Sequence, residues 1–130
     1  MKHILTCSFG KDSIATALLA LQHGEPLDEL VYSEVMFSDT VSGELPEHKR
    51  FIYETAIPYF EKCGIPTRVL RGQKTYLDCF YRIVSRGNAE GKLASFPLTG
   101  RCSIQRDCKL PPIRAYQKTL PHDTVYYLGI

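Results

Sequence analysis

The sequence predicts a Rossmann-like α/β domain, with three layers α/β/α and a mainly parallel sheet, that covers residues 1–130 as a single unit. Four short apolar runs have the length and composition of strands, at 2–7, 30–37, 67–70 and 124–130. Helical patterns separate these runs, and strands that alternate with helices form βαβ units with parallel strands. Right-handed crossovers then place ligands at the carboxyl ends of the strands. We expect the first strand to lie centrally, close to the last.

The first helix is expected at residues 13–23, directly after the first strand. Its apolar residues recur at i, i+3, i+4 and i+7, which is the spacing of one helix face. These residues are Ile14, Ala17, Leu18 and Leu21. Gly24 and Pro26 then end the helix, before the second strand at 30–37.

A second helix is expected to begin at Pro46, since proline favours the first turn of a helix. Pro58 is expected to kink this helix and Gly64 to end it. Its inner face is expected to carry three apolar residues, Phe51, Ile52 and Ala56.

The third strand at 67–70 leads to a third helix at 76–86, which Gly87 follows. Residues 88–100 form a long loop, and long loops in compact domains are often functional. Residues 103–118 are expected to be partly helical, with an interruption at Pro111 and Pro112. The last run, 124–130, has the pattern of a buried strand.

Composition excludes several classes of protein. The chain has 130 residues, 44% hydrophobic and 23% charged, and a formal net charge of +2. This balance argues against disorder and gives no electrostatic footprint for bulk nucleic-acid binding. No apolar run reaches the roughly 20 residues of a membrane span. We therefore expect a cytoplasmic protein that does not bind a membrane, and nothing in the composition indicates a nucleic-acid partner.

The stretch CSFGKDS, residues 7–13, lies where the first strand leads into the first helix. The first N–H groups of a helix have no partner within the helix, and the helix dipole attracts an anion there. Gly10 would let the backbone approach a phosphate or adopt a positive φ, Lys11 adds a positive charge, and Ser8 and Ser13 add hydroxyl donors. Asp12 would cap the helix or help to hold Mg²⁺. The residues alone leave a phosphate loop and an ordinary capped turn equally open.

The same stretch resembles the SGGxDS signature of the PP-loop superfamily (ATP pyrophosphatases, adenine nucleotide alpha-hydrolase-like), with Phe9 in place of the first glycine. Two further segments resemble the phosphoadenosine phosphosulfate reductase family of that superfamily. SDTVSGELPEH, at 38–48, is similar to its Asp-Thr-Gly…Phe-Pro-Glu-Thr segment, with a small insertion. CSIQRDCKLPP, at 102–112, is similar to its Cys-Thr-x-x-Leu-Lys-x-x-Pro segment, with a longer gap between cysteine and lysine.

The resemblance implies a Rossmann-like fold and a site for ATP or a related adenine nucleotide, with Mg²⁺. It implies that the phosphates are held by the loop residues Ser8, Phe9, Gly10, Lys11, Asp12 and Ser13. Asp39 and Thr40 would lie beside the phosphate site. Lys109 and Arg101 would face the anionic end of the nucleotide. Lys11, Asp12 and Lys109 would be the catalytic residues.

The activity that the resemblance implies is cleavage of ATP between its α and β phosphates, with adenylyl transfer, in the complete form of the protein. Reduction of a sulfonucleotide is a second possibility, but the Glu-Cys-Gly-Leu-His motif of thioredoxin-dependent reductases is not found in the sequence. A non-catalytic nucleotide sensor or assembly module is a third.

Relatives continue past the last strand with an Asp-Glu-x-x-Arg type segment and more helices. We therefore expect a domain that lacks the C-terminal part of the family, and a homo-oligomer that covers the open edge.

The five cysteines are odd in number and irregularly spaced, which favours reduced thiols or metal ligands over disulfides. Cys102 and Cys108 are candidate metal ligands, for zinc or an iron–sulfur cluster. Two ligands do not complete a site, so such a centre would need further ligands from outside this chain. Three cysteines are expected to pack in the core, Cys7, Cys63 and Cys79.

Overall fold

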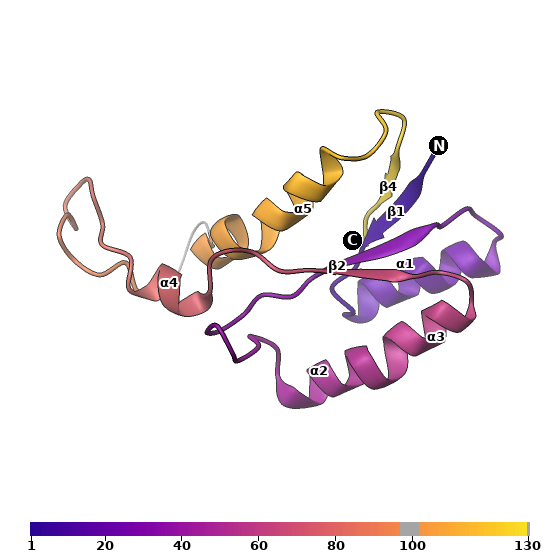
Figure 1. Cartoon of the computed structure of the whole chain (residues 1–130), viewed down its shortest axis with the longest axis horizontal. Coiled ribbons are helices and arrows are strands. Elements are labelled where there is room, and N and C mark those ends of the chain that lie inside the picture. The colour runs from indigo at the N-terminus through magenta and orange to yellow at the C-terminus, as the bar shows by residue number, and fades with distance from the viewer. Residues whose placement is uncertain (97–101, 130) are drawn as a thin grey trace.

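In the computed structural model, which describes residues 1–96 and 102–129, four parallel strands form one sheet in the order β3–β2–β1–β4 (Figure 1). The strands are β1 (His3–Thr6), β2 (Glu29–Ser33), β3 (Thr67–Leu70) and β4 (Val125–Tyr127). β1 pairs with both β2 and β4, so the first strand is internal and lies beside the last. The predicted α/β class, the parallel sheet and the inner position of the first strand are confirmed.

Helices cover both faces of the sheet. They are α1 (Lys11–Gln22), α2 (Pro46–Phe51), α3 (Ile57–Lys62), α4 (Tyr76–Phe80) and α5 (Leu110–Gln117), with π-helical turns η1 (Ile52–Ala56) and η2 (Gln105–Lys109). The main core joins α1 and the continuous segment α2–η1–α3 to one face, through buried residues such as Ala17, Ile52, Phe60 and Leu30. On the other face, the Ser33 hydroxyl donates to the backbone carbonyl of Lys109, 2.9 Å away. Figure 1 shows the strands between α5 and the α2–α3 segment.

The expected interruption at Pro58 takes the form of the π-helical turn η1, which directly precedes α3. Proline has no N–H to donate and its ring clashes with a preceding carbonyl, so a wider turn lets the helix continue. Ile52 and Ala56 are buried as expected. The expectation for Phe51 was wrong, because its ring is exposed at the end of α2, beside the ring of His48.

The expected helix at 76–86 is much shorter. α4 begins with a capping box, in which Thr75 accepts from the Asp78 N–H and the Asp78 carboxylate accepts from the Thr75 N–H. It ends at Phe80, and the chain then forms a projecting arm, residues 81–96, that Figure 1 shows extending away from the sheet. The arm turns back on itself through an antiparallel bridge between Ile83 and Leu93. The expected helix at 76–86 was therefore too long, and the chain after Phe80 pairs with itself instead.

Two strands are also shorter than expected. β2 ends at Ser33 because the backbone of residues 35–43 pairs with itself, with the Gly43 N–H donating to the Val35 carbonyl over 2.8 Å. The last strand is only partly buried, and Tyr126 is 40% exposed. As an edge strand, β4 has β1 as its neighbour on one side. In the described part of the chain, no helix has the length and apolar character needed to cross a membrane.

A buried carboxylate ties the sheet to α5 near the amino ends of the strands. Glu29 accepts a hydrogen bond from the Tyr116 hydroxyl, 2.7 Å away, and one from the Lys2 ammonium, 2.9 Å away. Arg68 also donates to this carboxylate, and its guanidinium lies 4.6 Å from the centre of the Tyr116 ring. Burial raises the pKa of Glu29, but the hydrogen bonds from Tyr116, Lys2 and Arg68 outweigh burial and leave this pKa below its ordinary 4.5.

We expect Glu29→Gln to lower the free energy of unfolding by about 1–3 kcal/mol at neutral pH, because three donors lose a charged acceptor. A carboxylate with a lowered pKa stabilises the fold above its unfolded-state pKa, and this contribution is lost as the pH falls through the folded-state value. The difference between variant and wild type should therefore shrink below pH 4.5, the ordinary pKa of Glu29. Urea unfolding across this pH range measures it. The exposed Glu25→Gln is the matched control, and an equal loss of stability in both variants would contradict the assignment.

Candidate functional site

A cavity of about 1080 Å³ opens at the carboxyl ends of β1, β2 and β4. Its lining includes most of the turn after β1, the end of β2, one side of η2 and α5, and the residues after β4. β1 lies between β2 and β4, and the helices that follow β1 and precede β4 cover opposite faces of the sheet. This is the switch point of an open parallel sheet, where ligands of such folds bind.

The turn after β1 has a left-handed residue at its centre. Phe9 has φ 59°, while Gly10 has an ordinary extended conformation with φ −77°. The positive φ that the sequence suggested for Gly10 therefore occurs one residue earlier, at a residue with a bulky side chain. The Phe9 ring is buried and meets the Tyr32 ring edge to face, with centroids 5.4 Å apart. Core packing of the ring thus holds the backbone in a conformation that costs about 1–2 kcal/mol.

The amino end of α1 forms one wall of the cavity. The helix begins at Lys11, with Gly10 in the capping position and no side-chain cap from the described residues. Asp12 is therefore not the cap; it lies in the first turn, where its carboxylate accepts from the Lys11 ammonium over 2.7 Å. Ser13 donates to the Gly10 carbonyl over 3.2 Å, and its hydroxyl lies 3.4 Å from that of Ser8. Two hydroxyls and the first N–H groups of a helix thus meet at one place.

The opposite wall comes from η2 and α5. Lys109 is half-buried and lines the cavity, and its position is fixed by the hydrogen bond from Ser33 to its carbonyl. Gln105 adds an amide to this wall, and Ile104 and Ile113 add apolar surface. The site therefore has a cationic group across from the amino end of α1.

A third wall comes from the segment after β2. The Tyr32 hydroxyl donates to the Glu44 carboxylate over 3.0 Å, and both side chains line the cavity. Burial raises the pKa of Tyr32 well above its ordinary value, and the negative charge of Glu44 raises it further, so the hydroxyl stays protonated. Gly43 fits closely here, because a Cβ atom would come within 2.7 Å of both the Tyr76 ring and the Val35 carbonyl.

The fully buried Glu34 anchors this segment. Its carboxylate accepts from Arg71, from the Tyr53 hydroxyl at 3.2 Å and from the Ser42 hydroxyl at 3.1 Å. Through Ser42, which precedes Gly43, the end of β3 and the helix η1 hold the third wall in place.

Most of the residues that the sequence singled out line the cavity, namely Ser8, Gly10, Lys11, Asp12, Ser13, Lys109 and Cys102. Phe9 is buried under the turn and supports it from below. Asp39 and Thr40 lie in an exposed turn beyond β2, away from the cavity lining. Arg101 lies outside the described residues. Cys102 is exposed at the cavity, whereas Cys108 is buried beside Cys79. Cys7 and Cys79 are buried as expected, but the expectation for Cys63 was wrong, because this residue is exposed.

Several cavity residues were not predicted as site residues from the sequence, among them Tyr32, Glu44 and Gly129. A close approach occurs at Gly129, where a Cβ atom would come within 3.0 Å of the Ser13 N and Cα atoms. The chain after β4 thus passes directly over the first turn of α1. A single sequence gives no signal for such contacts, because the partners are far apart in the chain.

The lining has few donors for a metal ion. Asp12 and Glu44 supply its carboxylates, and the residues described here contain no group of three His, Cys, Asp or Glu side chains that could hold an ion. Mg²⁺ commonly binds through one or two carboxylates together with the phosphates of a substrate. Asp12, at the amino end of α1, fits that mode. Cys102 and Cys108 lie in different environments, one exposed and one buried.

Comparison with family models, curated proteins and solved structures gives no match to the chain. The chemistry of the site therefore has to be argued from the cavity itself. Its donors, which are hydroxyls, helix N–H groups and two lysines, suit an anionic ligand, and its apolar walls suit a ring or a hydrocarbon.

We expect Phe9→Gly to be more stable than Phe9→Ala by about 1 kcal/mol, because both lose the ring but glycine adopts a positive φ without strain. The order should reverse at Phe60, a buried residue in α3, where glycine costs about 1 kcal/mol relative to alanine. Urea unfolding of the four variants measures both differences. The same order at the two positions would show that the Phe9 backbone is not left-handed.

Proposed function

We propose that the chain is an adenine-nucleotide-binding domain of the PP-loop type, related to the phosphoadenosine phosphosulfate reductase family. The observation that carries the proposal is the cavity whose wall contains the amino end of α1 with Ser8, Lys11 and Ser13. Three sequence segments resemble the family, and all three contribute residues to this cavity: 7–13, 38–48 through Gly43 and Glu44, and 102–112.

The phosphates would bind at the amino end of α1. The dipole of a helix gives roughly half a positive charge there, and its first N–H groups point toward the ligand. Gly10 has no side chain to obstruct this approach, and the Ser8 and Ser13 hydroxyls add donors. Lys11 is 89% exposed, so its ammonium can leave its present carboxylate partner, Asp12, and turn toward a phosphate.

The rest of the nucleotide would occupy the remainder of the cavity. Ligand pockets commonly measure about 300–1,000 Å³, and this cavity, at about 1080 Å³, is slightly larger than that. It has room for a nucleotide and a second substrate. Tyr76, Phe96 and Ile104 give the apolar surface that an adenine ring or an acceptor would contact.

The reaction that suits these groups is adenylyl transfer. An acceptor oxygen attacks the α-phosphorus of ATP, the bond to the bridging oxygen breaks, and pyrophosphate leaves with the electron pair. Lys11 and Lys109 would stabilise the charge that develops on the phosphate oxygens. Mg²⁺, held by the phosphates and Asp12, would supply further charge neutralisation.

One observation favours sulfonucleotide reduction as a second candidate. The Cys102 thiol is exposed and lines the cavity, within reach of a ligand. In that reaction the cysteine sulfur attacks the sulfur of the sulfonucleotide, and the nucleotide phosphate leaves. A second thiol must then release sulfite, and it would come from an external dithiol reductant.

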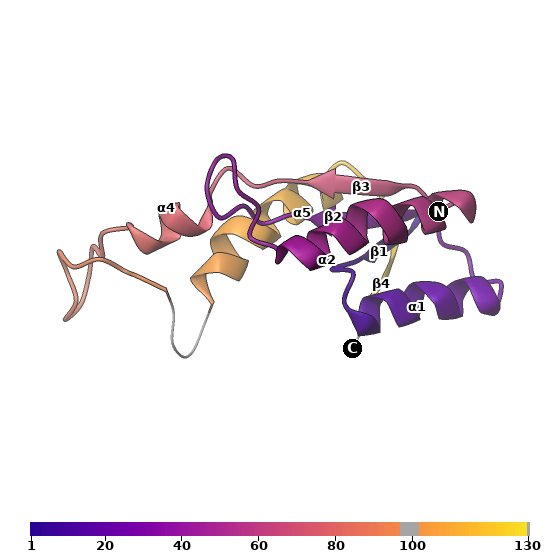
Figure 2. The same ribbon diagram turned by 90° about the horizontal axis from the view of Figure 1, so that it is seen from below.

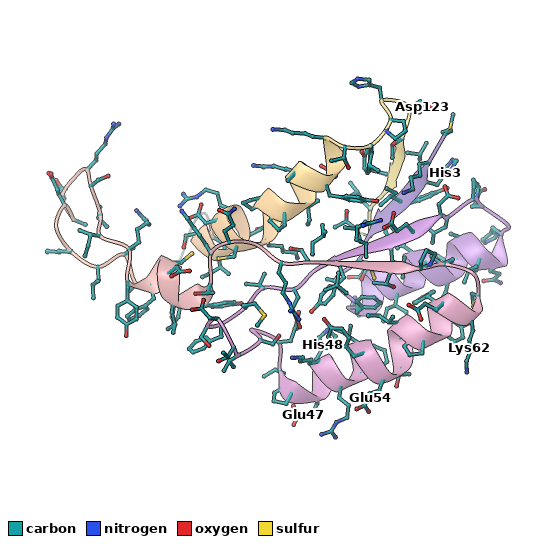
Figure 3. The ribbon with its side chains drawn as sticks, in the orientation of Figure 1. His3, Glu47, His48, Glu54, Lys62 and Asp123 are labelled. Atoms are coloured by element: carbon teal, nitrogen blue, oxygen red, sulfur yellow. The ribbon has the colours of Figure 1, made fainter. Side chains whose placement is uncertain are left out.

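We expect Lys11→Ala to weaken ATP binding about ten- to a hundredfold, the loss of one charge-assisted contact of about 1.5–3 kcal/mol. The apo-protein melting temperature should move little, since the side chain is exposed. Calorimetric titration of ATP into both proteins measures the affinity. Lys62→Ala removes the same charge at the end of α3, away from the cavity, and is the matched control (Figure 3). Equal affinities in all three proteins would contradict a phosphate loop and would indicate that residues 7–13 form an ordinary turn.

Activity assays separate the candidate reactions. Adenylyl transfer predicts that wild type releases pyrophosphate from ATP and Mg²⁺ when an acceptor is present, and that Lys109→Ala releases less. Reduction predicts instead a sulfite adduct on Cys102 after incubation with phosphoadenosine phosphosulfate, detected by mass spectrometry and lost in Cys102→Ser. Nucleotide binding with neither product would indicate a non-catalytic nucleotide sensor.

A further inference from the structure

Two cysteine thiols meet in a second apolar cluster, separate from the main core. Cys79 comes from α4 and Cys108 from η2, and their Sγ atoms lie 3.4 Å apart. Both side chains are buried, and Ile104, Val35 and Tyr76 surround them. The two cysteines are 29 positions apart in the sequence, so their contact is made by the fold.

The separation of these two sulfur atoms is close to bonding distance. The S–S bond of a disulfide is about 2.05 Å long, so the thiols need to approach by only about 1.4 Å. α4 has five residues and leads into the projecting arm, so the approach needs a small displacement of this helix, which stretches two hydrogen bonds, from the Tyr76 and Leu77 N–H groups to the Met36 and Phe37 carbonyls. We propose that Cys79 and Cys108 form a reactive dithiol, which a low-molecular-weight disulfide such as glutathione disulfide converts into an intramolecular disulfide.

The exchange proceeds in two balanced steps. One cysteine thiolate attacks a sulfur of glutathione disulfide, forming a mixed disulfide and releasing one glutathione thiolate. The other cysteine thiolate then attacks the protein sulfur of the mixed disulfide and releases the second glutathione. The protein loses two protons and two electrons, and one glutathione disulfide becomes two glutathione molecules.

Burial makes the first step slow in the resting structure. Burial and the neighbouring Cys79 thiol raise the pKa of Cys108 to about 12, so its thiolate is scarce near neutral pH. The reaction therefore requires local opening of α4, which admits both water and the oxidant. Opening is easiest for short elements with few buried contacts, and α4 has one fully buried residue, Cys79.

Formation of the disulfide would also act on the cavity. Lys109 directly follows Cys108, and Tyr76 lies in α4 three residues before Cys79; both line the cavity. Figure 1 shows α4 at the end of the molecule away from α1. Because α4 is the element that moves, the bond shifts Tyr76 in the cavity wall, while Lys109 stays held by the hydrogen bond from Ser33. This consequence rests on the proposed nucleotide site, and we expect oxidation to weaken ATP binding about fivefold, the lower end of typical coupling between sites.

The test uses a variant without the two exposed cysteines, Cys63→Ser with Cys102→Ser, which retains the three buried thiols Cys7, Cys79 and Cys108. Incubation with glutathione disulfide should lower the number of titratable thiols from three to one per chain. Mass spectrometry without reductant should show no disulfide-linked dimer. Peptide mapping without reductant should show Cys79 joined to Cys108. Adding Cys108→Ala to this background should abolish the loss of thiols. Retention of all three thiols, or a bond that involves Cys7, would overturn the proposal.

Titration of ATP into the reduced and oxidised forms tests the coupling separately. A fivefold loss of affinity on oxidation is expected, and dithiothreitol should reverse it. Equal affinities in the two forms would overturn the effect on the cavity. If neither form binds ATP, the proposed nucleotide function is wrong, and thiol titration with peptide mapping still decides whether the dithiol forms a disulfide.

Discussion

The parallel pairing of β1 with two neighbours is the constraint on which the rest of the molecule depends. Ile4 and Leu5 are in register with Glu29 and Leu30 on one side, and with Tyr126 and Tyr127 on the other. Parallel strands in register bring their carboxyl ends to one edge, and the chain segments that leave those ends must meet there. The cavity is formed by these segments together with η2 and α5. A shift in either register would separate its walls, so sheet pairing determines the site before any side chain does.

In the turn after β1, a strained backbone conformation at Phe9 is combined with burial of the Phe9 ring. A left-handed conformation is unfavourable for phenylalanine, yet the Phe9 ring is buried against Tyr32, and burial of such a side chain contributes about 1.5–3 kcal/mol. Packing therefore outweighs a strain of about 1–2 kcal/mol. Tyr32 in turn donates to Glu44 in the cavity. The core residue that fixes the direction of α1 is thus coupled through one side chain to the polar lining, which is how backbone strain can be maintained at a binding site.

Local pattern was sufficient for the strands, the parallel sheet and the place of the cavity, because apolar runs and βαβ order are properties of neighbouring residues. It was insufficient where distant parts of the chain meet. The spacing of Leu77 and Phe80 fits a helix, but pairing between Ile83 and Leu93 ends that helix early. Gly129 contacts Ser13, and Cys79 contacts Cys108. These residues are far apart in the chain, and the local sequence around them does not predict the contacts. The apolar pattern predicted the strands and the parallel sheet, whereas contacts between distant segments determined the details of the site.

The charges of the site are arranged for short-range binding. The formal net charge of the chain is +2, too small to attract an anion from a distance. Lys11 is paired with Asp12, so the turn itself adds almost no net charge. An anion is then favoured by groups that act within a few ångströms, the N–H groups of α1, two serine hydroxyls and the Lys109 ammonium. In the proposed nucleotide complex, such donors would select a ligand by its shape and oxygen positions more than by its charge. If the Lys11 ammonium bound a phosphate in place of Asp12, the Asp12 carboxylate would be free to bind a cation.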